Sequence, residues 1–215
     1  MKVVKASAEI ISPIDGVEVL KHLERCGRVC YKSEHKITEN SAPGFVAGLM
    51  ARGHESVLEH FSFTACFIAN RGVTHEIVRH RLASYSQEST RYCLYSDERF
   101  GEELTVIKPC FFDQDTDRDL ENYLKWECAC RDAEDWYKEL TRNGAKAQEA
   151  RDILPHGLKS ELIMTANLRE WRHFFKLRCD AAAHPQMREV ALMLLKEAHE
   201  KIPVIFDDLY EKFIK

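Results

Sequence analysis

The chain has 215 residues and a mass of 25.0 kDa, which suits a single domain over 1–215 better than two independent ones. Hydrophobic residues make up 45% and charged residues 31%, so the chain can bury a core, and disorder is excluded as its main state. The net charge of −4 and the pI of about 6.2 give no global attraction to nucleic acid, so any bound anion must be held by local cations.

The first 81 residues predict strands and helices in turn. Residues 1–12 alternate loosely between apolar and polar side chains and suit a strand. Apolar residues at helical spacing predict helices over 15–31 and 41–53, the second with a proline in its first turn and a glycine at its end. Phenylalanines at alternate positions predict a strand over 61–69, and helical spacing resumes over 73–81.

Helical patterns dominate the rest of the chain. Residues 82–108 look irregular or extended, and 160–166 suit a strand. Helices are expected over 117–143, 146–154 and 168–178, and over two final segments that Pro203 separates. Because helices outnumber strands and the two do not alternate regularly, the pattern favours an α+β fold over a doubly wound sheet.

The sequence predicts neither a membrane span nor a secretion signal. No apolar run approaches the ~18–20 residues of a spanning helix, and the first twelve residues lack a long apolar block before a cleavage site. None of the eight cysteines belongs to a C-x-x-C pair, so we expect reduced thiols without a cofactor role. Together these patterns predict a cytoplasmic protein.

His75 and His80 are the first candidates for a metal site. A helical zinc motif needs two histidines four positions apart, on one face of the helix. These two are five apart, which separates them by about 140° around a helix. Arg79 and Arg81 also flank His80 with positive charge, which repels a dication. We therefore expect no metal site.

Residues 79–92 form a polar tract suited to anions. The tract holds three arginines, one histidine, three serines, one threonine and two tyrosines, and its only acid is Glu88. Guanidinium groups bind phosphate oxygens through paired hydrogen bonds. The alternative interpretation is a solvated helix end with ordinary surface arginines, and the composition leaves both open.

Residues 167–178 predict an amphipathic helix that carries cations. Its apolar face, expected in the core, holds Leu168, Trp171, Phe174 and Phe175. Another face is expected to hold the basic residues Arg169, His173 and Lys176, and Arg178 lies at the C-terminal end. A lone histidine on such a helix is usually just a satisfied polar residue. The residues alone therefore indicate an α+β protein with arginine-rich anion sites, suited to nucleotides.

Several segments share their residues and their spacing with one known family. Arg79-His80-Arg81 is followed by a gap of seven residues and then by Ser89, with Arg91 and Tyr92 behind it. Further matching segments are 53–61, 151–155, 167–174 and 183–186, with Arg178 at the family's spacing. On these residues, which extend from about residue 53 to 190, the chain resembles the flavin-dependent thymidylate synthases.

The resemblance implies a reaction, its cofactors and an assembly. Members of the family make dTMP by methylating C5 of dUMP, with the carbon from methylenetetrahydrofolate and the hydride from FAD that NADPH reduces. Their twisted, mainly antiparallel sheet flanked by helices agrees with the predicted α+β fold. They are homotetramers with active sites between subunits, so the implied partners are small molecules and further copies of the chain, with no membrane and no nucleic acid.

The resemblance also implies which residues bind and react. FAD contacts are implied for Ser56, Arg79, His80, Arg81, Gln87, Asn167, Arg169 and His173. Nucleotide contacts are implied for Glu76, Arg79, Gln87, Ser89, Arg91, Arg151 and Arg178. Arg178 is also the candidate catalytic residue, because a guanidinium on the carbonyl edge of uracil would stabilise the charge that develops there when C5 attacks a carbon electrophile.

Some of these positions depart from simple expectation. Ser89 has no base partner at a fixed spacing, so we interpret it as a substrate contact rather than a nucleophile. Glu76 stands where the family often has glutamine, and an acid near a phosphate repels it unless the acid is paired. Ser56 replaces a common threonine, and Ser86-Gln87 replaces a common Asn-Glu, changes that keep hydrogen-bonding capacity.

Two other classes of protein are weighed against this interpretation. A small nucleic-acid-binding protein could place Arg79, Arg81, Arg91 and Arg151 on phosphates, although the net charge of −4 argues against it. A flavoenzyme acting on another pyrimidine nucleotide would share the same arginines, and only its product would differ. A purely structural protein would bind no flavin and would not turn over a nucleotide.

Overall fold

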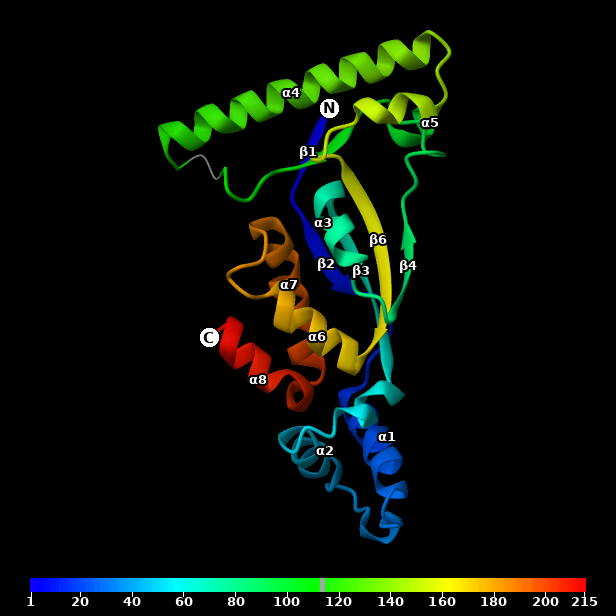
Figure 1. Cartoon of the computed structure of the whole chain (residues 1–215), viewed down its shortest axis with the longest axis vertical. Coiled ribbons are helices and arrows are strands. Elements are labelled where there is room, and N and C mark those ends of the chain that lie inside the picture. The colour runs from blue at the N-terminus through cyan, green and yellow to red at the C-terminus, as the bar shows by residue number, and fades with distance from the viewer. Residues whose placement is uncertain (113–114) are drawn as a thin grey trace. The chain divides into compact units, whose positions relative to one another are not determined.

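The structure, a computed structural model, describes residues 1–112 and 115–215 (Figure 1). Its helices are α1 Gly16–Val29, α2 Ala42–Ala51, α3 Arg71–Ile77, α4 Asp117–Arg142, α5 Ala147–Ala150, α6 Leu168–Arg178, α7 Pro185–Lys201 and α8 Pro203–Phe213. Its strands are β1 Lys2–Val4, β2 Ser7–Ile10, β3 Ser62–Asn70, β4 Ala83–Gln87, β5 Thr105–Ile107 and β6 Lys159–Asn167. Short 3₁₀ segments are η1 Glu34–Lys36, η2 Glu55–His60, η3 Glu98–Phe100 and η4 Arg151–Ile153.

The chain divides into two compact units. Unit 1 comprises Met1–Ser7, Phe67–Arg79 and Ser86–Leu162. Unit 2 comprises Ala8–Cys66, His80–Tyr85 and Ile163–Lys215. The longer strands pass from one unit into the other, so the chain crosses between them several times. The expectation of one domain over 1–215 stays a prediction.

The strands form two sheets. Four of them pair in the order β2-β3-β6-β4, and neighbouring strands run in opposite directions in Figure 1. The short strands β1 and β5 form a parallel pair in which Lys2 lies opposite Thr105. Mixed helix and mainly antiparallel sheet confirm the predicted α+β class. The finer, family-specific fold stays a prediction.

Capping side chains explain where several helices begin. The Asp15 carboxylate accepts the backbone N–H groups of Val17 and Glu18 at the start of α1, as short polar side chains do at helix N-termini. The Asn70, Thr116 and Asn167 side chains do the same for α3, α4 and α6. At the other end of α4, Gly144 takes a φ of +91°, a conformation that glycine adopts without strain. Apart from the one over 73–81, the helices expected from the sequence are confirmed to within a few residues, and the 3₁₀ segment η4 forms the second half of the one expected over 146–154.

One expected boundary is wrong. The helix predicted over 73–81 ends at Ile77 in the structure, so His80 lies in the connection to β4. His80 is held there by hydrogen bonds to Glu170 and Tyr85, which local periodicity does not reveal. The region 82–108, expected to be irregular or extended, contains the short strands β4 and β5.

Unit 2 has an aromatic core under α6. Trp171 stacks on Phe63 of β3 with 4.6 Å between ring centroids, and its indole N–H donates to the Phe63 carbonyl. Phe174 and Phe175 continue the cluster and are fully buried. The apolar face predicted for this helix is confirmed. Its burial fixes which side of α6 presents the polar residues.

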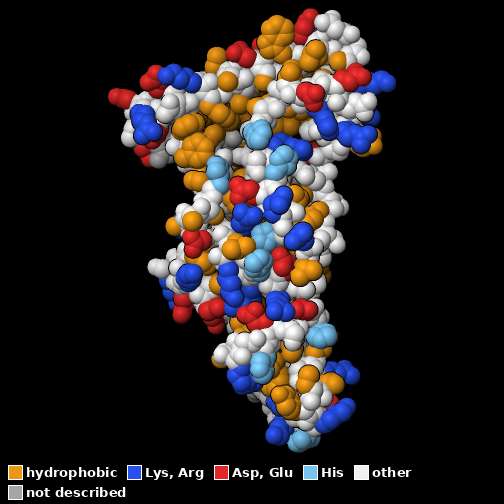
Figure 2. All heavy atoms as spheres, in the orientation of Figure 1, with side chains coloured by type: hydrophobic (Ala, Val, Ile, Leu, Met, Phe, Trp, Pro, Cys, Tyr) orange, Lys and Arg blue, Asp and Glu red, His pale blue; other side chains and the backbone are white. Residues whose placement is uncertain are grey.

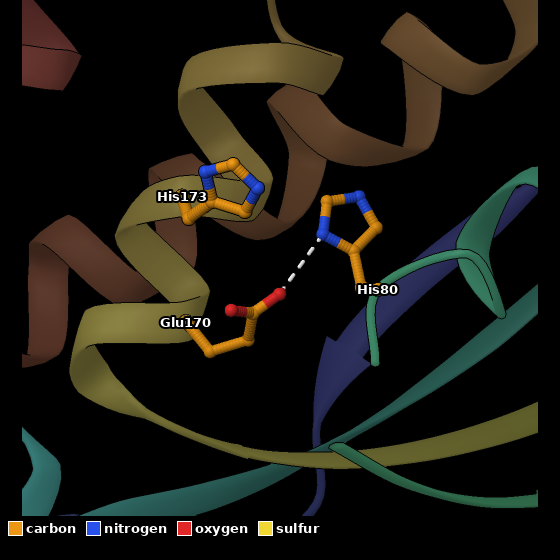
Figure 3. Close-up of side chains that lie close together, drawn as sticks. All are labelled: His80, Glu170 and His173. Carbon is orange, nitrogen blue, oxygen red and sulfur yellow. Dashed lines mark hydrogen bonds and ion pairs between the residues drawn. The ribbon is translucent and has the colours of Figure 1, made fainter. Parts of the chain in front are cut away.

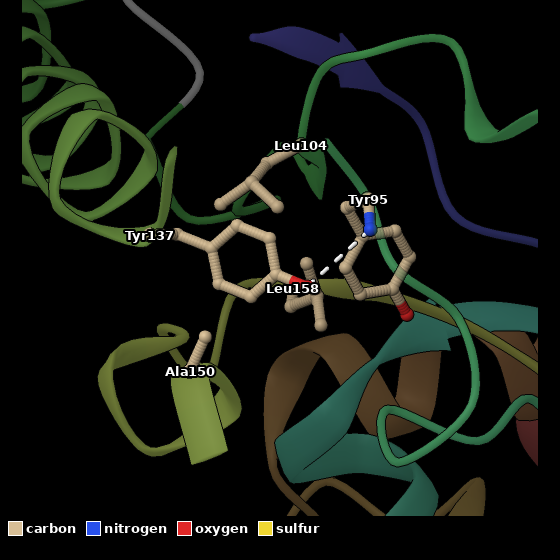
Figure 4. Close-up of a cluster of buried hydrophobic side chains, with 5 residues drawn as sticks. All are labelled: Tyr95, Leu104, Tyr137, Ala150 and Leu158. Atoms are coloured by element: carbon tan, nitrogen blue, oxygen red, sulfur yellow. Dashed lines mark hydrogen bonds between the residues drawn. The ribbon is translucent and has the colours of Figure 1, made fainter. Parts of the chain in front are cut away.

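Unit 1 has a smaller core beneath α4 (Figure 4). Its buried members are Tyr95, Leu104, Tyr137, Ala150 and Leu158. The backbone N–H of Tyr95 donates to the Tyr137 hydroxyl at 3.3 Å, so the polar end of that buried ring is satisfied.

The surface carries charges of both signs. Figure 2 shows acidic, basic and histidine side chains interspersed on the face in view, in keeping with a net charge of −4. In the part of the chain that the structure describes, no helix combines the length and the apolar character that a membrane crossing requires.

Candidate functional site

His80, Glu170 and His173 form the centre of a polar cluster in unit 2 (Figure 3). Glu170 and His173 lie three residues apart on α6 and therefore share a face of that helix. His80 approaches from the connection before β4, and its Nδ1 lies 3.1 Å from Oε1 of Glu170. The two imidazole rings meet edge to face with 5.5 Å between their centroids. The side chain of His80 is only 3% exposed.

Arg178 determines which ring nitrogen of His80 carries the proton. Its Nε donates to Nε2 of His80 at 3.1 Å, and a guanidinium can only donate. The imidazole proton therefore sits on Nδ1 and is donated to Glu170. Burial lowers the pKa of His80, the charge of Arg178 lowers it further, and the hydrogen bond to Glu170 partly opposes both. His80 is thus a neutral link between an arginine and a carboxylate.

Tyr85 holds the backbone of the same histidine. Its hydroxyl donates to the His80 carbonyl at 2.5 Å. Burial, together with the charge of Glu170, raises the pKa of Tyr85 to about 12, so the phenol keeps its proton at neutral pH. The position of His80 is therefore set through both its ring and its main chain.

The cluster also has the composition of a metal site. One ligand atom from each of His80, Glu170 and His173 lies within 4.8 Å of the others, and two histidines with a carboxylate suit several transition metals. However, both ring nitrogens of His80 already take part in hydrogen bonds, one of them with the cationic Arg178. We interpret the cluster as a hydrogen-bond network, and the absence of a metal stays a prediction.

A cavity of about 480 Å³ adjoins the cluster within unit 2. Its lining includes Asn167, Arg169 and His173, three of the residues expected to contact FAD, so the structure brings these three together. Asn167 also caps α6, its Oδ1 accepting the backbone N–H of Glu170 at 2.9 Å. The expectation that Arg169, His173 and Lys176 share a polar face is confirmed, because all three line this cavity.

Acids in the lining are paired with cations. Glu59 accepts a hydrogen bond from Nη1 of Arg169 at 2.6 Å, and both side chains are about half exposed. Glu55 lies 3.7 Å from Nζ of Lys176 and 3.6 Å from Nε of the buried Arg172. Arg172 is in turn held by both carboxylate oxygens of Asp208 on α8. An incoming anion could therefore replace these acids as the ion-pair partner of Arg169 and Lys176.

The remaining residues expected to bind FAD are placed differently. Ser56 is exposed on η2, beside Glu55, and Arg81 is exposed directly after His80. Arg79 and Gln87 belong to unit 1. Gln87 donates from Nε2 to the buried hydroxyls of Thr74 and Ser160, at 2.9 and 3.0 Å. The flavin contacts expected of these four residues stay predictions.

Most residues expected to bind the nucleotide lie in unit 1: Glu76, Arg79, Gln87, Ser89, Arg91 and Arg151. Ser89 stands in a turn, where its carbonyl accepts the N–H groups of Tyr92 and Cys93 and its hydroxyl accepts that of Arg91. Arg91 is exposed over the ring of Tyr92. Arg151 lines a second cavity of about 300 Å³. Arg178 alone among the nucleotide residues belongs to unit 2.

Sequence reasoning missed Glu170 and Tyr85 as members of the site. For Glu170 a signal existed, because it precedes His173 by three residues and must share its helical face. Nothing in the sequence marks Tyr85, whose partner is a main-chain carbonyl. Sequence reasoning also did not predict that Glu55 and Glu59 pair with the basic side chains of α6.

Comparison with known proteins identifies the family. A family model described as "Thymidylate synthase complementing protein" matches residues 16–204. The chain is 38% identical over 167 residues to a flavin-dependent thymidylate synthase of Pyrococcus abyssi, covering 77% of this chain and 66% of that relative. It is 36% identical over 186 residues to one of Pyrococcus furiosus, covering 86% and 74%. For one of Geobacter sulfurreducens the identity is 34% over 188 residues, covering 84% and 78%. The chain belongs to the flavin-dependent thymidylate synthase family, which is a family of enzymes.

Proposed function

We propose that this chain makes dTMP by reductive methylation of dUMP. In this proposal methylenetetrahydrofolate donates the carbon, and FAD, reduced by NADPH, is the source of the hydride. The observation that carries the proposal is the hydrogen-bonded link from Glu170 through His80 to Arg178, which joins two segments 90 positions apart. Both segments carry the family resemblance and lie within residues 16–204, which the family model matches, and the relatives bear the name of this activity.

The cavity beside the cluster fits part of FAD. Its volume of about 480 Å³ lies in the range of small-molecule sites. Arg169 and Lys176 supply the cations that a diphosphate requires, and Asn167 supplies an amide for a polar ring edge. His80 and His173 lie against each other at the same cluster. We further propose that Ser56, Arg79, Arg81 and Gln87 complete the FAD contacts.

We propose that the nucleotide binds through the exposed cations of unit 1 and through Arg178. Arg91 and Ser89 suit its phosphate, because a guanidinium and a hydroxyl in one turn can both donate to phosphate oxygens. Arg79, Gln87 and Arg151 are proposed as further contacts. We also propose that Glu76 contacts the nucleotide, at a group that can donate a hydrogen bond to its carboxylate.

Arg178 is the proposed catalytic residue. When bound, the reduced flavin supplies the hydride chemistry. Arg178 donates through Nε to His80, and its guanidinium is proposed to act on a carbonyl edge of uracil. Glu170 holds the proton of His80 on Nδ1, so Nε2 stays available as the acceptor that orients Arg178. Because the positive charge of Arg178 is positioned before the reaction, it lowers the free energy needed to develop negative charge on the uracil.

Product analysis tests the proposed function. The purified chain, supplied with FAD, NADPH, methylenetetrahydrofolate and dUMP, should form dTMP, and the Arg178→Ala variant should form much less. Oxidation of NADPH that depends on a pyrimidine nucleotide, but yields no dTMP, would instead indicate a flavoenzyme with another product. Absence of any flavin binding would remove both interpretations.

We also propose a homotetramer whose active sites draw on several subunits. Closed symmetric assemblies are the common state of oligomeric enzymes. Light scattering should then give about four times the 25.0 kDa chain mass. Inactive Ser56→Ala and Arg178→Ala chains should regain activity when mixed and refolded together. A fully active monomer would contradict the proposal.

A further inference from the structure

Glu88 is the only acid of the polar tract 79–92, and the proposed function gives it no role. It follows β4 directly and precedes Ser89, in the turn that also carries Arg91. Its side chain is 17% exposed, so the carboxylate lies largely out of solvent. A negative charge beside two residues proposed to hold a phosphate repels that phosphate unless a cation compensates it. A carboxylate in this place therefore requires a compensating cation, and the structure supplies one.

Three groups satisfy the Glu88 carboxylate. Nζ of Lys159 donates to Oε2 at 2.8 Å, and the backbone N–H of Glu161 donates to the same oxygen at 3.1 Å. The hydroxyl of Tyr95 donates to Oε1, also at 2.8 Å. Lys159 and Glu161 belong to β6, and the N–H of Glu88 in turn donates to the Glu161 carbonyl at 2.9 Å. The start of the turn is thus attached to the sheet, and the charge of Lys159 compensates that of Glu88.

Tyr95 attaches the far end of the turn to the same carboxylate. It belongs to the buried core of unit 1, where its backbone N–H donates to the Tyr137 hydroxyl (Figure 4). Burial raises the pKa of Tyr95, and the charge of Glu88 and the hydrogen bond to it raise it further, so the phenol keeps its proton and remains a donor. Residues 89–94 therefore lie between two side chains that bond to each other.

Main-chain hydrogen bonds shape the turn between these two side chains. The Ser89 carbonyl accepts the N–H groups of Tyr92 and Cys93, at 3.1 and 2.9 Å. The Ser89 hydroxyl accepts the N–H of Arg91 at 3.3 Å. These bonds are local, so they set the shape of the turn but not its position on the sheet. The Glu88 carboxylate joins the turn both to β6 and to the core, and so contributes to that position.

We propose that Glu88 is a positioning residue for the phosphate of the nucleotide. Its bonds to Lys159 and Tyr95 hold the turn in place, so that the hydroxyl and the guanidinium proposed to bind the phosphate meet it together. A turn that is ordered beforehand loses less conformational entropy when the ligand binds, and the same contacts then give a higher affinity. The inference rests on the proposed function, and it adds three residues to which the resemblance assigns no role.

Binding of dUMP and of deoxyuridine, which lacks the phosphate, to the FAD-loaded chain tests this role. The wild type should bind dUMP more tightly than deoxyuridine. Glu88→Ala should weaken the binding of dUMP by about tenfold, the scale of a lost charge-assisted hydrogen bond, and should change that of deoxyuridine little. A charge effect alone has the opposite sign, because removing an acid near an anion site favours the anion. In turnover, KM for dUMP should rise while kcat stays nearly unchanged.

Two milder variants keep the test decisive if Glu88→Ala does not fold. Glu88→Gln retains one acceptor oxygen, so it should recover part of the loss. Tyr95→Phe removes only the hydroxyl and should weaken the binding of dUMP by about threefold. The matched control is Glu98→Ala, which removes an exposed acid of η3 in the same unit and should bind both ligands as the wild type does. Circular dichroism identifies the variants that are folded.

Unchanged or tighter binding of dUMP by folded Glu88→Ala, or by folded Glu88→Gln and Tyr95→Phe alike, would overturn the inference. An equal loss for dUMP and deoxyuridine would also overturn it, because it would indicate a general disturbance of the site. A wild type that binds neither ligand would refute the proposed function and this inference with it. A wild type that binds dUMP and forms dTMP, with variants that keep its preference for the phosphate, would refute the role of Glu88 alone.

Discussion

His80 in unit 2 and Arg151 in unit 1 belong to the same predicted active site, yet their surroundings differ in kind. His80 is buried, and hydrogen bonds engage both of its ring nitrogens. Arg151 is exposed and has no acid partner within the described residues. Unit 2 thus holds groups whose geometry is set before any ligand arrives, whereas unit 1 presents cations that act by charge. Substitutions in the two units should therefore fail in different ways.

Arg178→Ala should give the largest effect, because it removes the charged end of the unit 2 network. We expect turnover of dUMP to fall by roughly 10²–10³, about 3–4 kcal/mol, the scale for losing one preorganised donor. Arg178→Lys keeps the charge but loses the planar fork, so it should recover only part of the loss. Turnover, flavin content and melting temperature are measured together.

A purely structural role for Arg178 makes the opposite prediction. The residue lies in the last turn of α6, where a cation stabilises the helix dipole. If it acts only there, Arg178→Ala should melt several degrees lower while the folded enzyme turns over normally. That result would remove its catalytic role.

Gln87→Ala sharpens the comparison, because Gln87 lies in unit 1 and is half-buried, yet its side chain is held by two hydrogen bonds. Its amide donates to the hydroxyls of Thr74 and Ser160, both buried. Loss of these bonds should lower the free energy of unfolding by about 1–3 kcal/mol. Chemical denaturation measures it, with the exposed Gln148→Ala on α5 as the control. Equal stability of the two variants would show that Gln87 serves only ligands.

The same residues show how far the sequence predicts the molecule. Periodicity and capping residues such as Asp15 and Asn167 locate the helices, because both signals are local. The end of α3 was misplaced because the partners of His80 lie up to 98 positions away. Helical spacing predicted which α6 residues share the face that lines the cavity. It could not predict that Glu59 pairs with Arg169, because these residues are 110 positions apart and meet only through the tertiary fold.

Acid should destabilise the wild type through His80. Burial, assisted by Arg178, lowers the pKa of His80 in the folded chain below its unfolded value of about 6.5. Below that pH the unfolded chain binds more protons, so the free energy of unfolding should fall as the pH drops from 7 to 5. His80→Gln, which cannot be protonated, should show a shallower fall in melting temperature. The exposed His54→Gln should follow the wild type, and a His80→Gln profile parallel to the wild type would contradict the assignment.

Glu59→Gln should give the smallest effect, and in the favourable direction. Glu59 holds Arg169 by an exposed ion pair, which must open before Arg169 can contact an anionic cofactor. Exposed pairs are weak, so releasing the arginine should tighten FAD binding by only about two- to fivefold. Flavin fluorescence titration at low salt measures it, and Glu161→Gln, an exposed acid outside the cavity proposed for FAD, is the control. Weaker binding by Glu59→Gln would show that Glu59 itself contacts the cofactor.

Retention of flavin is the most direct test of the central claim that the His80 cluster of unit 2 holds FAD. Wild type, His80→Ala and Arg91→Ala are each reconstituted with FAD and passed through gel filtration, and the flavin absorbance is compared with the protein absorbance. We expect the wild type and Arg91→Ala to elute yellow, because Arg91 is exposed in unit 1 and is proposed to contact the nucleotide rather than FAD. His80→Ala should lose most of its flavin while remaining folded. A colourless wild type, or a His80→Ala variant that keeps as much flavin as the wild type, would contradict the account.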